Sequence, residues 1–260
     1  MTDADIEATK APLMEHLIEL RMRLVRSLAA FIVLFVIFFY FSKGIFNILV
    51  LPYGRIAGES AKLIYTAPQE FFFTQMKVAM FAAGFFALPV ILSQIYAFVA
   101  PGLYKKERAG FAPYLIATPV FFALGGLLVY FVVLPNLLNF FIQTGEKQPG
   151  VTPIELLPRV SEYLSLIMTL IFAFGLVFQM PVILTLLGRI GIVSSQFLID
   201  KWRYAAIIIT AVAGVLTPPD ILSMMTLAVP GMLLYGLSIL SVRFVEKQRG
   251  TEVAVHEDES

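Results

Sequence analysis

Residues 111–141 read FAPYLIATPVFFALGGLLVYFVVLPNLLNFF, and none of them carries a charge. A helix needs about 20 mostly apolar residues to cross the ~30 Å hydrocarbon core of a bilayer, and this run is longer than that. Pro119 and Pro135 lie inside it. Each proline removes a backbone donor and clashes with the preceding turn, so we expect the helix to bend there. The run predicts a membrane-spanning helix.

Apolar runs on either side predict further spans of the same kind. We place six spans at residues 24–41, 71–99, 111–141, 163–187, 204–216 and 221–242. The fifth would cover only roughly 20 Å as a helix. Spans five and six are therefore either short, with the turn at residues 217–220 at bilayer depth, or part of an ordinary tilted hairpin. The expected fold class is all-α, a polytopic membrane helical bundle with six transmembrane helices.

The composition fits a chain that lies mostly in the bilayer. It is 59% hydrophobic and 14% charged, whereas a soluble domain is about half apolar and a quarter charged. We expect a single transmembrane domain at residues 1–243, which an amphipathic segment at residues 11–23 leads into the membrane. A disordered acidic tail should follow at residues 244–260. No cleavable signal peptide is visible, because the N-terminus is acidic and the first apolar run starts late.

Lysine and arginine are unevenly shared between the two sides of this map. Most of them lie before the first span, after the second and fourth spans, and in the C-terminal tail. Segments rich in lysine and arginine stay on the cytoplasmic side of a membrane, so we expect both termini in the cytoplasm. An even number of spans also requires both termini on one side.

The sequence lacks the groups that several chemistries need. There is no cysteine, and the only histidines, His16 and His256, lie outside the spans, so we expect no disulfide and no histidine-rich metal site. There is no phosphate-binding glycine loop, no Gly-x-Ser-x-Gly elbow and no His-Glu-x-x-His pair. We therefore expect that the protein is not an enzyme and binds no cofactor. The basic residues are split among short loops, which argues against nucleic-acid binding.

A polytopic secondary transporter or channel for a small solute is the alternative reading. Such proteins carry membrane-embedded charge and often internal repeats. No repeat stands out here, and no Asp or Glu lies in the middle of a span, although Lys77 lies within the second. Lys77 either seeks a partner or reaches to the interface. Gln94 and Gln179 either pair within the bundle or with another subunit, and Gln179 could instead bond to a backbone carbonyl near Pro181.

Two acidic residues near the ends of spans have an ordinary explanation beside any functional one. Glu19 precedes the first span, and Arg23 lies four residues later on the same helical face, so the two could simply pair. Glu107 follows the second span and is the only acid among the three bases of its segment, which could neutralise it. The residue pattern alone does not choose between these readings.

Five segments, in register with the six spans, resemble the TatC family, the large subunits of the twin-arginine translocase. They are HLIELR at residues 16–21, QIYAFVAPGLY at 94–104 with ER at 107–108, YFVVLP at 130–135, FG at 174–175 with FQMP at 178–181, and LTPPD at 216–220. The similarity runs from about Leu13 to Arg243. Tyr96 departs from the family, which often has Trp there, but either ring suits a membrane interface.

The resemblance implies a function, a set of partners and a set of site residues. The function is that of the core receptor subunit of the twin-arginine translocase in a bacterial inner membrane. Such a subunit binds twin-arginine signal peptides at the cytoplasmic face and supports proton-motive-force-driven export of folded proteins. Its implied partners are the small single-span subunits TatA and TatB and membrane lipids, in an oligomeric complex. The implied signal-binding residues are Glu19, Glu107, Arg21, Phe98 and Arg108, and the implied partner-subunit contacts are Gln179, Pro52 and Asp220.

Paired carboxylates suit the implied ligand. Arginine presents five donors in a rigid planar fork, which two carboxylate oxygens accept together and which lysine cannot reproduce. We therefore expect Glu19 and Glu107 to point into one cytoplasmic groove.

Overall fold

The computed structural model describes residues 3–58, 62–99, 112–146, 157–216 and 221–258. The regular structure of these residues is helical, apart from an isolated bridge between Ile64 and Arg159. Five of the helical stretches are long and apolar enough to cross a membrane, and a sixth, at Trp202–Val215, is apolar but shorter. The predicted all-α membrane fold is confirmed.

Each of the six predicted spans corresponds to one helix or to two or three consecutive helical elements. The observed bounds are α1 (Asp3–Tyr40), α3 (Glu70–Val99), α4 (Ala112–Leu128) continuing through the π-helix η4 (Val129–Val133) into α5 (Leu134–Glu146), α6 (Val160–Val177) followed by α7 (Met180–Arg189), α9 (Trp202–Leu216) and α10 (Ile221–Asp258). The fifth span is the shortest, as expected, with 15 residues in α9.

Two helices were not predicted from the sequence, namely α2 (Ser42–Ala57) and α8 (Ser195–Asp200). The apolar residues of α2 are interrupted by Lys43, Pro52 and Arg55, so no run of span length marks it. α8 is only six residues long, which is too short for a hydrophobic period to be recognised.

α1 runs unbroken from Asp3 to Tyr40, so residues 11–23 lie in the same helix as the first span. The other end of the chain differs from expectation. α10 continues to Asp258, whereas disorder was expected from residue 244. Glu, Lys, Gln and Arg are good helix formers, and the Glu246 carboxylate accepts a hydrogen bond from the backbone N–H of Ser195 at 2.9 Å, which holds this part of α10 to the start of α8.

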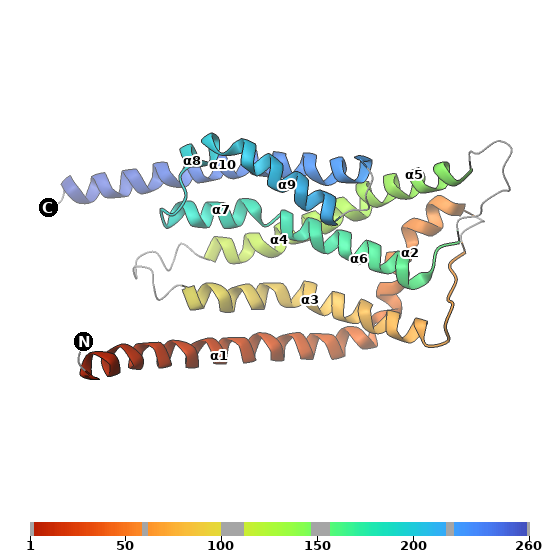
Figure 1. Ribbon diagram of the computed structural model, residues 1–260, viewed down its shortest axis with the longest axis horizontal. Helices are drawn as coiled ribbons and strands as arrows, with labels where there is room; N and C mark the ends of the chain where they lie inside the picture. The colour runs from red at the N-terminus through yellow and green to blue at the C-terminus, as the bar shows by residue number, and fades with distance from the viewer. Residues whose placement is uncertain (1–2, 59–61, 100–111, 147–156, 217–220, 259–260) are drawn as a thin grey trace. The chain divides into compact units, whose positions relative to one another are not determined.

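The described chain forms two compact units, residues 1–43 with 75–116 and residues 44–74 with 117–260. In the first unit, α1 and α3 lie side by side and run antiparallel (Figure 1). Nη1 of Arg23 in α1 donates to the backbone carbonyl of Gln94 in α3 at 3.4 Å. Further along, the Phe31 ring lies against Gly84, where an added Cβ would be 3.9 Å from it.

These two contacts fix how α1 and α3 are aligned. One turn from Arg23 toward the start of α1, Glu19 comes level with about Phe98 near the end of α3. At the other end, Lys77 comes level with about Tyr40, the last residue of α1. The alignment thus brings residues that are far apart in the sequence to the same end of the first unit.

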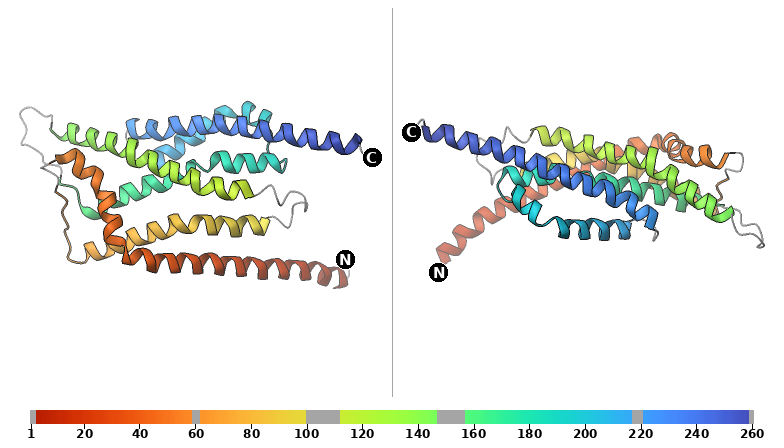
Figure 2. Two further views of the ribbon diagram at one scale, coloured as in Figure 1. Left: turned by 180° about the vertical axis from the view of Figure 1, so that it is seen from behind. Right: turned by 90° about the horizontal axis from the view of Figure 1, so that it is seen from above.

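In the second unit, small residues allow α4 and α6 to cross closely. A Cβ on Gly125 of α4 would lie 2.8 Å from the carbonyl oxygen of Phe174 in α6, and a Cβ on Gly175 would lie 2.5 Å from the ring of Phe122. On another side of this unit, α10 packs against α7, α8 and α9 (Figure 2).

Two of the prolines lie where the long helices change, Pro135 just after η4 and Pro181 at the start of α7, whereas Pro89 lies inside an unbroken α3 and Pro119 inside an unbroken α4. The π-helix η4 ends two residues before Pro135. Asn136 Nδ2 donates to the Val132 carbonyl at 2.8 Å and so satisfies part of the disturbed backbone. α6 stops before Pro181, which lies in the first turn of α7.

Candidate functional site

Glu19 binds a guanidinium group of its own helix. Its Oε1 accepts hydrogen bonds from Nε of Arg23 at 3.2 Å and from Nη2 of the same side chain. The Glu19 side chain is 32% exposed and that of Arg23 is 16% exposed. The ordinary pairing that the sequence allowed, between residues four apart, is therefore present. The geometry also shows that this carboxylate can accept two N–H donors from one guanidinium.

Arg23 joins this carboxylate to the neighbouring helix. While Nε and Nη2 point to Glu19, its Nη1 donates to the backbone carbonyl of Gln94 at 3.4 Å. One planar group therefore contacts an acid on α1 and the backbone of α3 at the same time. This fixes the direction in which the Arg23 fork lies between the two helices.

The other residues predicted for signal binding are placed as follows. Phe98 is half-buried and comes level with Glu19 in the alignment of α1 and α3. Arg21 is exposed, and because it follows Glu19 by two residues it points to roughly the opposite side of α1. Glu107 and Arg108 lie outside the described residues. The structure thus brings Glu19 and Phe98 to one end of the first unit, but does not bring Arg21 to Glu19.

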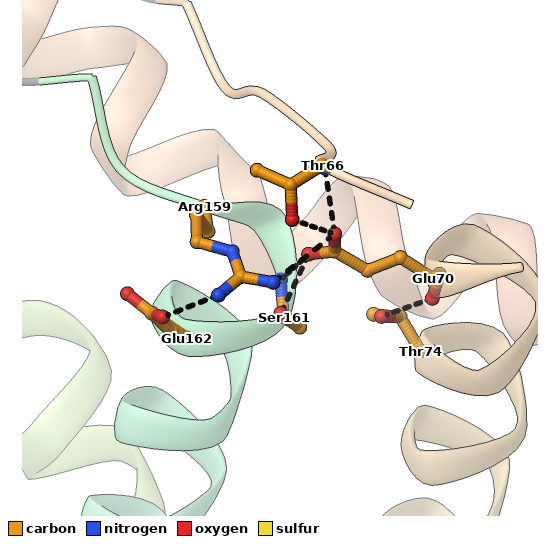
Figure 3. Close-up of polar contacts among 6 residues, drawn as sticks. All are labelled: Thr66, Glu70, Thr74, Arg159, Ser161 and Glu162. Carbon is orange, nitrogen blue, oxygen red and sulfur yellow. Dashed lines mark hydrogen bonds and ion pairs between the residues drawn. The ribbon is translucent and has the colours of Figure 1, made fainter. Parts of the chain in front are cut away.

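A second polar cluster, not predicted from the sequence, surrounds Glu70 at the start of α3 (Figure 3). Its Oε2 accepts from the backbone N–H of Thr66 at 2.8 Å and from the Thr66 hydroxyl at 3.3 Å. Its Oε1 accepts from the Ser161 hydroxyl at 2.6 Å and from the Ser161 N–H at 3.3 Å. Nη2 of Arg159 lies 3.6 Å from Oε2, and the Glu70 side chain is only 7% exposed. The charge is buried, but donors surround it.

The Glu70 cluster joins two segments of the second unit that are distant in the sequence. Backbone hydrogen bonds and a parallel bridge connect Ile64 with the residues at Arg159. Ser161 lies in the first turn of α6, whose N-cap residue supplies no side-chain cap. Glu70 therefore caps α6 from another helix, and a negative charge is favourable at a helix N-terminus. An acid in the first turn of α3, four residues after a threonine, was the only signal for it.

Pro52 lies buried in α2. It has no N–H, so the carbonyl of Ile48, four residues earlier, loses its helical donor. The Tyr130 hydroxyl donates to this carbonyl at 2.7 Å, and the Tyr163 hydroxyl donates to the next one, of Leu49, at 3.3 Å. Pro52 therefore leaves the Ile48 carbonyl free to accept from Tyr130, and Tyr163 of the same unit binds the carbonyl next to it. Its contact with another subunit stays a prediction.

Gln179 lies buried at the break between α6 and α7 and is 5% exposed. Its backbone N–H donates to the Leu176 carbonyl, three residues back, so the turn is tightened here. Its Nε2 donates to the Gly175 carbonyl at 3.3 Å and to the Thr118 carbonyl of α4 at 3.0 Å. The side chain thus repairs the helix break, as the sequence allowed, and also ties α6 to α4. Its contact with another subunit remains untested.

The remaining polar candidates are Lys77 and Asp220. Lys77 is exposed and level with the end of α1, which is where a lysine reaching for the membrane interface would lie. Asp220 lies outside the described residues. Within the parts of the chain that the structure describes, no group of three or more histidine and acidic side chains is arranged to hold a metal ion.

Comparison with known proteins identifies relatives over nearly the whole chain. A family model described as Sec-independent protein translocase protein (TatC) matches residues 15–230. The Sec-independent protein translocase protein TatC of Magnetococcus marinus is 46% identical over 253 residues, which are 97% of this chain and 91% of the relative. The protein of the same name from Rickettsia prowazekii is 41% identical over 245 residues, 94% of this chain and 97% of the relative.

Solved structures match as well. A crystal structure of the twin arginine translocase receptor TatC superposes with a TM-score of 0.75 at 34% identity and covers 88% of this chain and 99% of its own. A second crystal structure of the receptor, in the detergent DDM, gives a TM-score of 0.76 at 35% identity, with coverage of 86% and 98%.

Proposed function

Because the chain belongs to the TatC family of Sec-independent protein translocase proteins, we propose that it recognises twin-arginine signal peptides with Glu19 at the end of the α1–α3 pair. Its function is that of a receptor subunit of the translocase, and it is not an enzyme. What is proposed beyond this is the set of residues, the orientation and the partners.

The observation that carries the proposal is the Glu19–Arg23 pair. The carboxylate of Glu19 already accepts two donors from one guanidinium and is 32% exposed. An arginine of a signal peptide presents the same planar fork. Because a third of the Glu19 side chain is exposed and a carboxylate has acceptor sites for more than two donors, an incoming guanidinium can share this carboxylate with Arg23 or take its place.

We assign the second carboxylate of the site to Glu107, with Arg108 beside it. This rests on the family resemblance and on the position of α3. The helix ends at Val99, five residues after Gln94, whose backbone carbonyl contacts Arg23. The segment that carries Glu107 therefore leaves α3 at the end of the first unit where Glu19 lies.

The proposed orientation puts both termini in the cytoplasm of a bacterial inner membrane. The lysine and arginine distribution supports it. So does the start of α9, where Nζ of Lys201 lies 5.4 Å from the centre of the Tyr204 ring and the Arg203 guanidinium lies 5.9 Å from that of Trp202. Exposed Trp and Tyr beside basic residues are typical of a membrane interface, and the positive charge favours its cytoplasmic side.

The proposed partners are the single-span subunits TatA and TatB, which together with this chain support proton-motive-force-driven export. α9 has 15 residues, about 22 Å of helix, which is shorter than the ~30 Å hydrocarbon core. We propose that the partners dock near the end of α9, with Asp220 among the contacts. Contact at Gln179 would require its amide to release the Thr118 or the Gly175 carbonyl.

Replacement of Glu19 tests the proposal in cells. Glu19→Gln keeps the size of the side chain but removes the charge that a guanidinium needs, and a hydrogen bond to a charged group contributes about 1.5–3 kcal/mol. Export of a folded reporter carrying a twin-arginine signal should fall about tenfold or more. Glu162→Gln, which removes an acid that is 67% exposed at the start of α6, should export normally. Unchanged export by Glu19→Gln at equal expression would refute the assignment.

A further inference from the structure

The side chain of Gln94 holds an unused hydrogen-bond acceptor. The Ser93 hydroxyl donates its proton to the Val90 carbonyl at 2.6 Å. Because that proton is committed, the 3.3 Å contact between Gln94 Nε2 and Ser93 Oγ must have the amide as donor. The orientation of the amide is thereby fixed. Its Oε1 is buried and has no hydrogen-bond partner in the part of the chain that the structure describes.

The unused oxygen belongs to the residue that Arg23 contacts. The backbone carbonyl of Gln94 accepts from Nη1 of Arg23, and Nε and Nη2 of the same guanidinium bind Glu19. The Gln94 backbone carbonyl and the Glu19 carboxylate therefore already accept hydrogen bonds from two edges of one guanidinium. A buried acceptor without a donor is energetically unfavourable. A ligand that donates an N–H to the Gln94 oxygen would remove this cost.

Arginine is the ligand that fits these acceptors. Its five donors point in several directions of one plane, and a carboxylate accepts only two of them. The others need acceptors beside the carboxylate. Gln94 as a whole is partly exposed, so a rotation of its side chain that gives up the long 3.3 Å contact with Ser93 can present Oε1 without moving α3. A lysine ammonium has no such fork and cannot reach the carboxylate and the amide oxygen together in the same geometry.

We propose that the side-chain carbonyl of Gln94 is a specificity-determining acceptor, which takes an N–H of a signal-peptide arginine that Glu19 does not bind. This inference rests on the proposed function. The Gln94 oxygen would favour arginine over lysine. A guanidinium can donate to Glu19 and to this oxygen at the same time, whereas the uncharged amide adds little attraction for an ammonium group.

Gln75, a second glutamine of α3 with a buried and unpaired side-chain oxygen, supplies a matched control. Gln75 is 6% exposed, and neither its Nε2 nor its Oε1 has a partner among the described residues. It lies 19 positions before Gln94 and therefore near the opposite end of the same helix. Substitution of Gln75 by methionine removes an unpaired amide at similar volume, and substitution of Gln94 removes an unpaired oxygen together with one long hydrogen bond to Ser93. Both variants should therefore fold about as stably as the parent chain.

The test is the affinity of the purified full chain for a synthetic twin-arginine signal peptide and for its twin-lysine counterpart. Gln94→Met should weaken twin-arginine binding about tenfold and change twin-lysine binding by less than about twofold, while Gln75→Met should change neither. Gln94→Glu, which keeps an acceptor oxygen, should retain twin-arginine binding. Thermal unfolding of each variant checks that it is folded.

Two outcomes overturn the inference in distinguishable ways. If Gln94→Met behaves like Gln75→Met, with unchanged selectivity, while Glu19→Gln weakens twin-arginine binding, then the amide of Gln94 is only solvated and the proposed function stands. If Glu19→Gln also leaves the peptide affinity unchanged, the proposed site itself is wrong, and the role of Gln94 is wrong with it.

Discussion

At the scale of single residues, Glu19 and Glu70 show that burial decides what a carboxylate can do. Glu70 is 7% exposed and is surrounded by four hydrogen-bond donors and Arg159. Its removal would leave several buried donors unsatisfied, and no ligand could approach it. Glu19 is 32% exposed and pairs with Arg23 of its own helix. Only Glu19 is therefore suited to exchange one guanidinium for another.

Neutralisation of Glu70 should destabilise the second unit. In Glu70→Gln the amide N–H₂ would face the donors of Thr66 or Ser161, and the attraction to Arg159 would be lost. We expect the purified protein to unfold at a clearly lower temperature. Glu162→Gln, which removes only an exposed partner of Arg159, should unfold close to the parent temperature. Equal unfolding temperatures of the two variants would show that Glu70 does not hold the start of α6.

At the scale of helices, close crossings depend on the absence of side chains. The carbonyl of Phe174 lies 2.8 Å from the position that a Cβ of Gly125 would take. Because this neighbour is backbone, it cannot move aside as a flexible side chain would. The crossing of α4 and α6 also contains the hydrogen bond from Gln179 to the Thr118 carbonyl, so displacement of the helices would disturb both contacts.

Introduction of a methyl group at this crossing should be costly. Gly125→Ala should lower the free energy of unfolding by about 1–3 kcal/mol, as overpacking does in other well-packed cores. Gly236→Ala in α10, where nothing lies within 4 Å of the added Cβ, should instead be neutral or stabilising, because alanine favours a helix by up to about 1 kcal/mol over glycine. Denaturant titration in detergent checks both, and a neutral Gly125→Ala would contradict the observed crossing.

The sequence predicted the helices that are long and apolar enough to cross a bilayer. Long apolar runs with at most one charged residue marked the six spans, and Pro135 and Pro181 marked the breaks at η4 and before α7. α2 and α8 were missed because neither is a long apolar run. The alignment of α1 with α3 could not be predicted, since it depends on contacts such as Phe31 with Gly84 between residues far apart in the sequence.

The candidate site was predictable only in part, for the same reason. Glu19 and Phe98 were singled out by resemblance, and the pairing of Glu19 with Arg23 followed from helical spacing. The bridge from Arg23 to the Gln94 backbone, the unused amide oxygen of Gln94 and the capping of α6 by Glu70 all depend on packing between helices. No single-sequence pattern contains that information.

At the scale of the whole molecule, the two units carry different tasks. The first holds the guanidinium-binding end of α1 and α3 and is the proposed place of signal recognition. The second holds the Glu70 cluster, the α4–α6 crossing and the packing of α10 on α7 to α9. The proposed docking of the small subunits near the end of α9 falls in this second unit. The central claim for the protein is that Glu19 in the first unit touches a signal-peptide arginine.

A double-mutant cycle between the chain and its ligand measures that contact. The affinities of the parent chain and of Glu19→Gln are determined for a twin-arginine peptide and for two peptides in which one arginine or the other is replaced by glutamine. If Glu19 binds one of these arginines, the two substitutions will be non-additive for that arginine, with a coupling of about 1.5–3 kcal/mol. Effects that add to within about 0.3–0.5 kcal/mol for both arginines would contradict the claim.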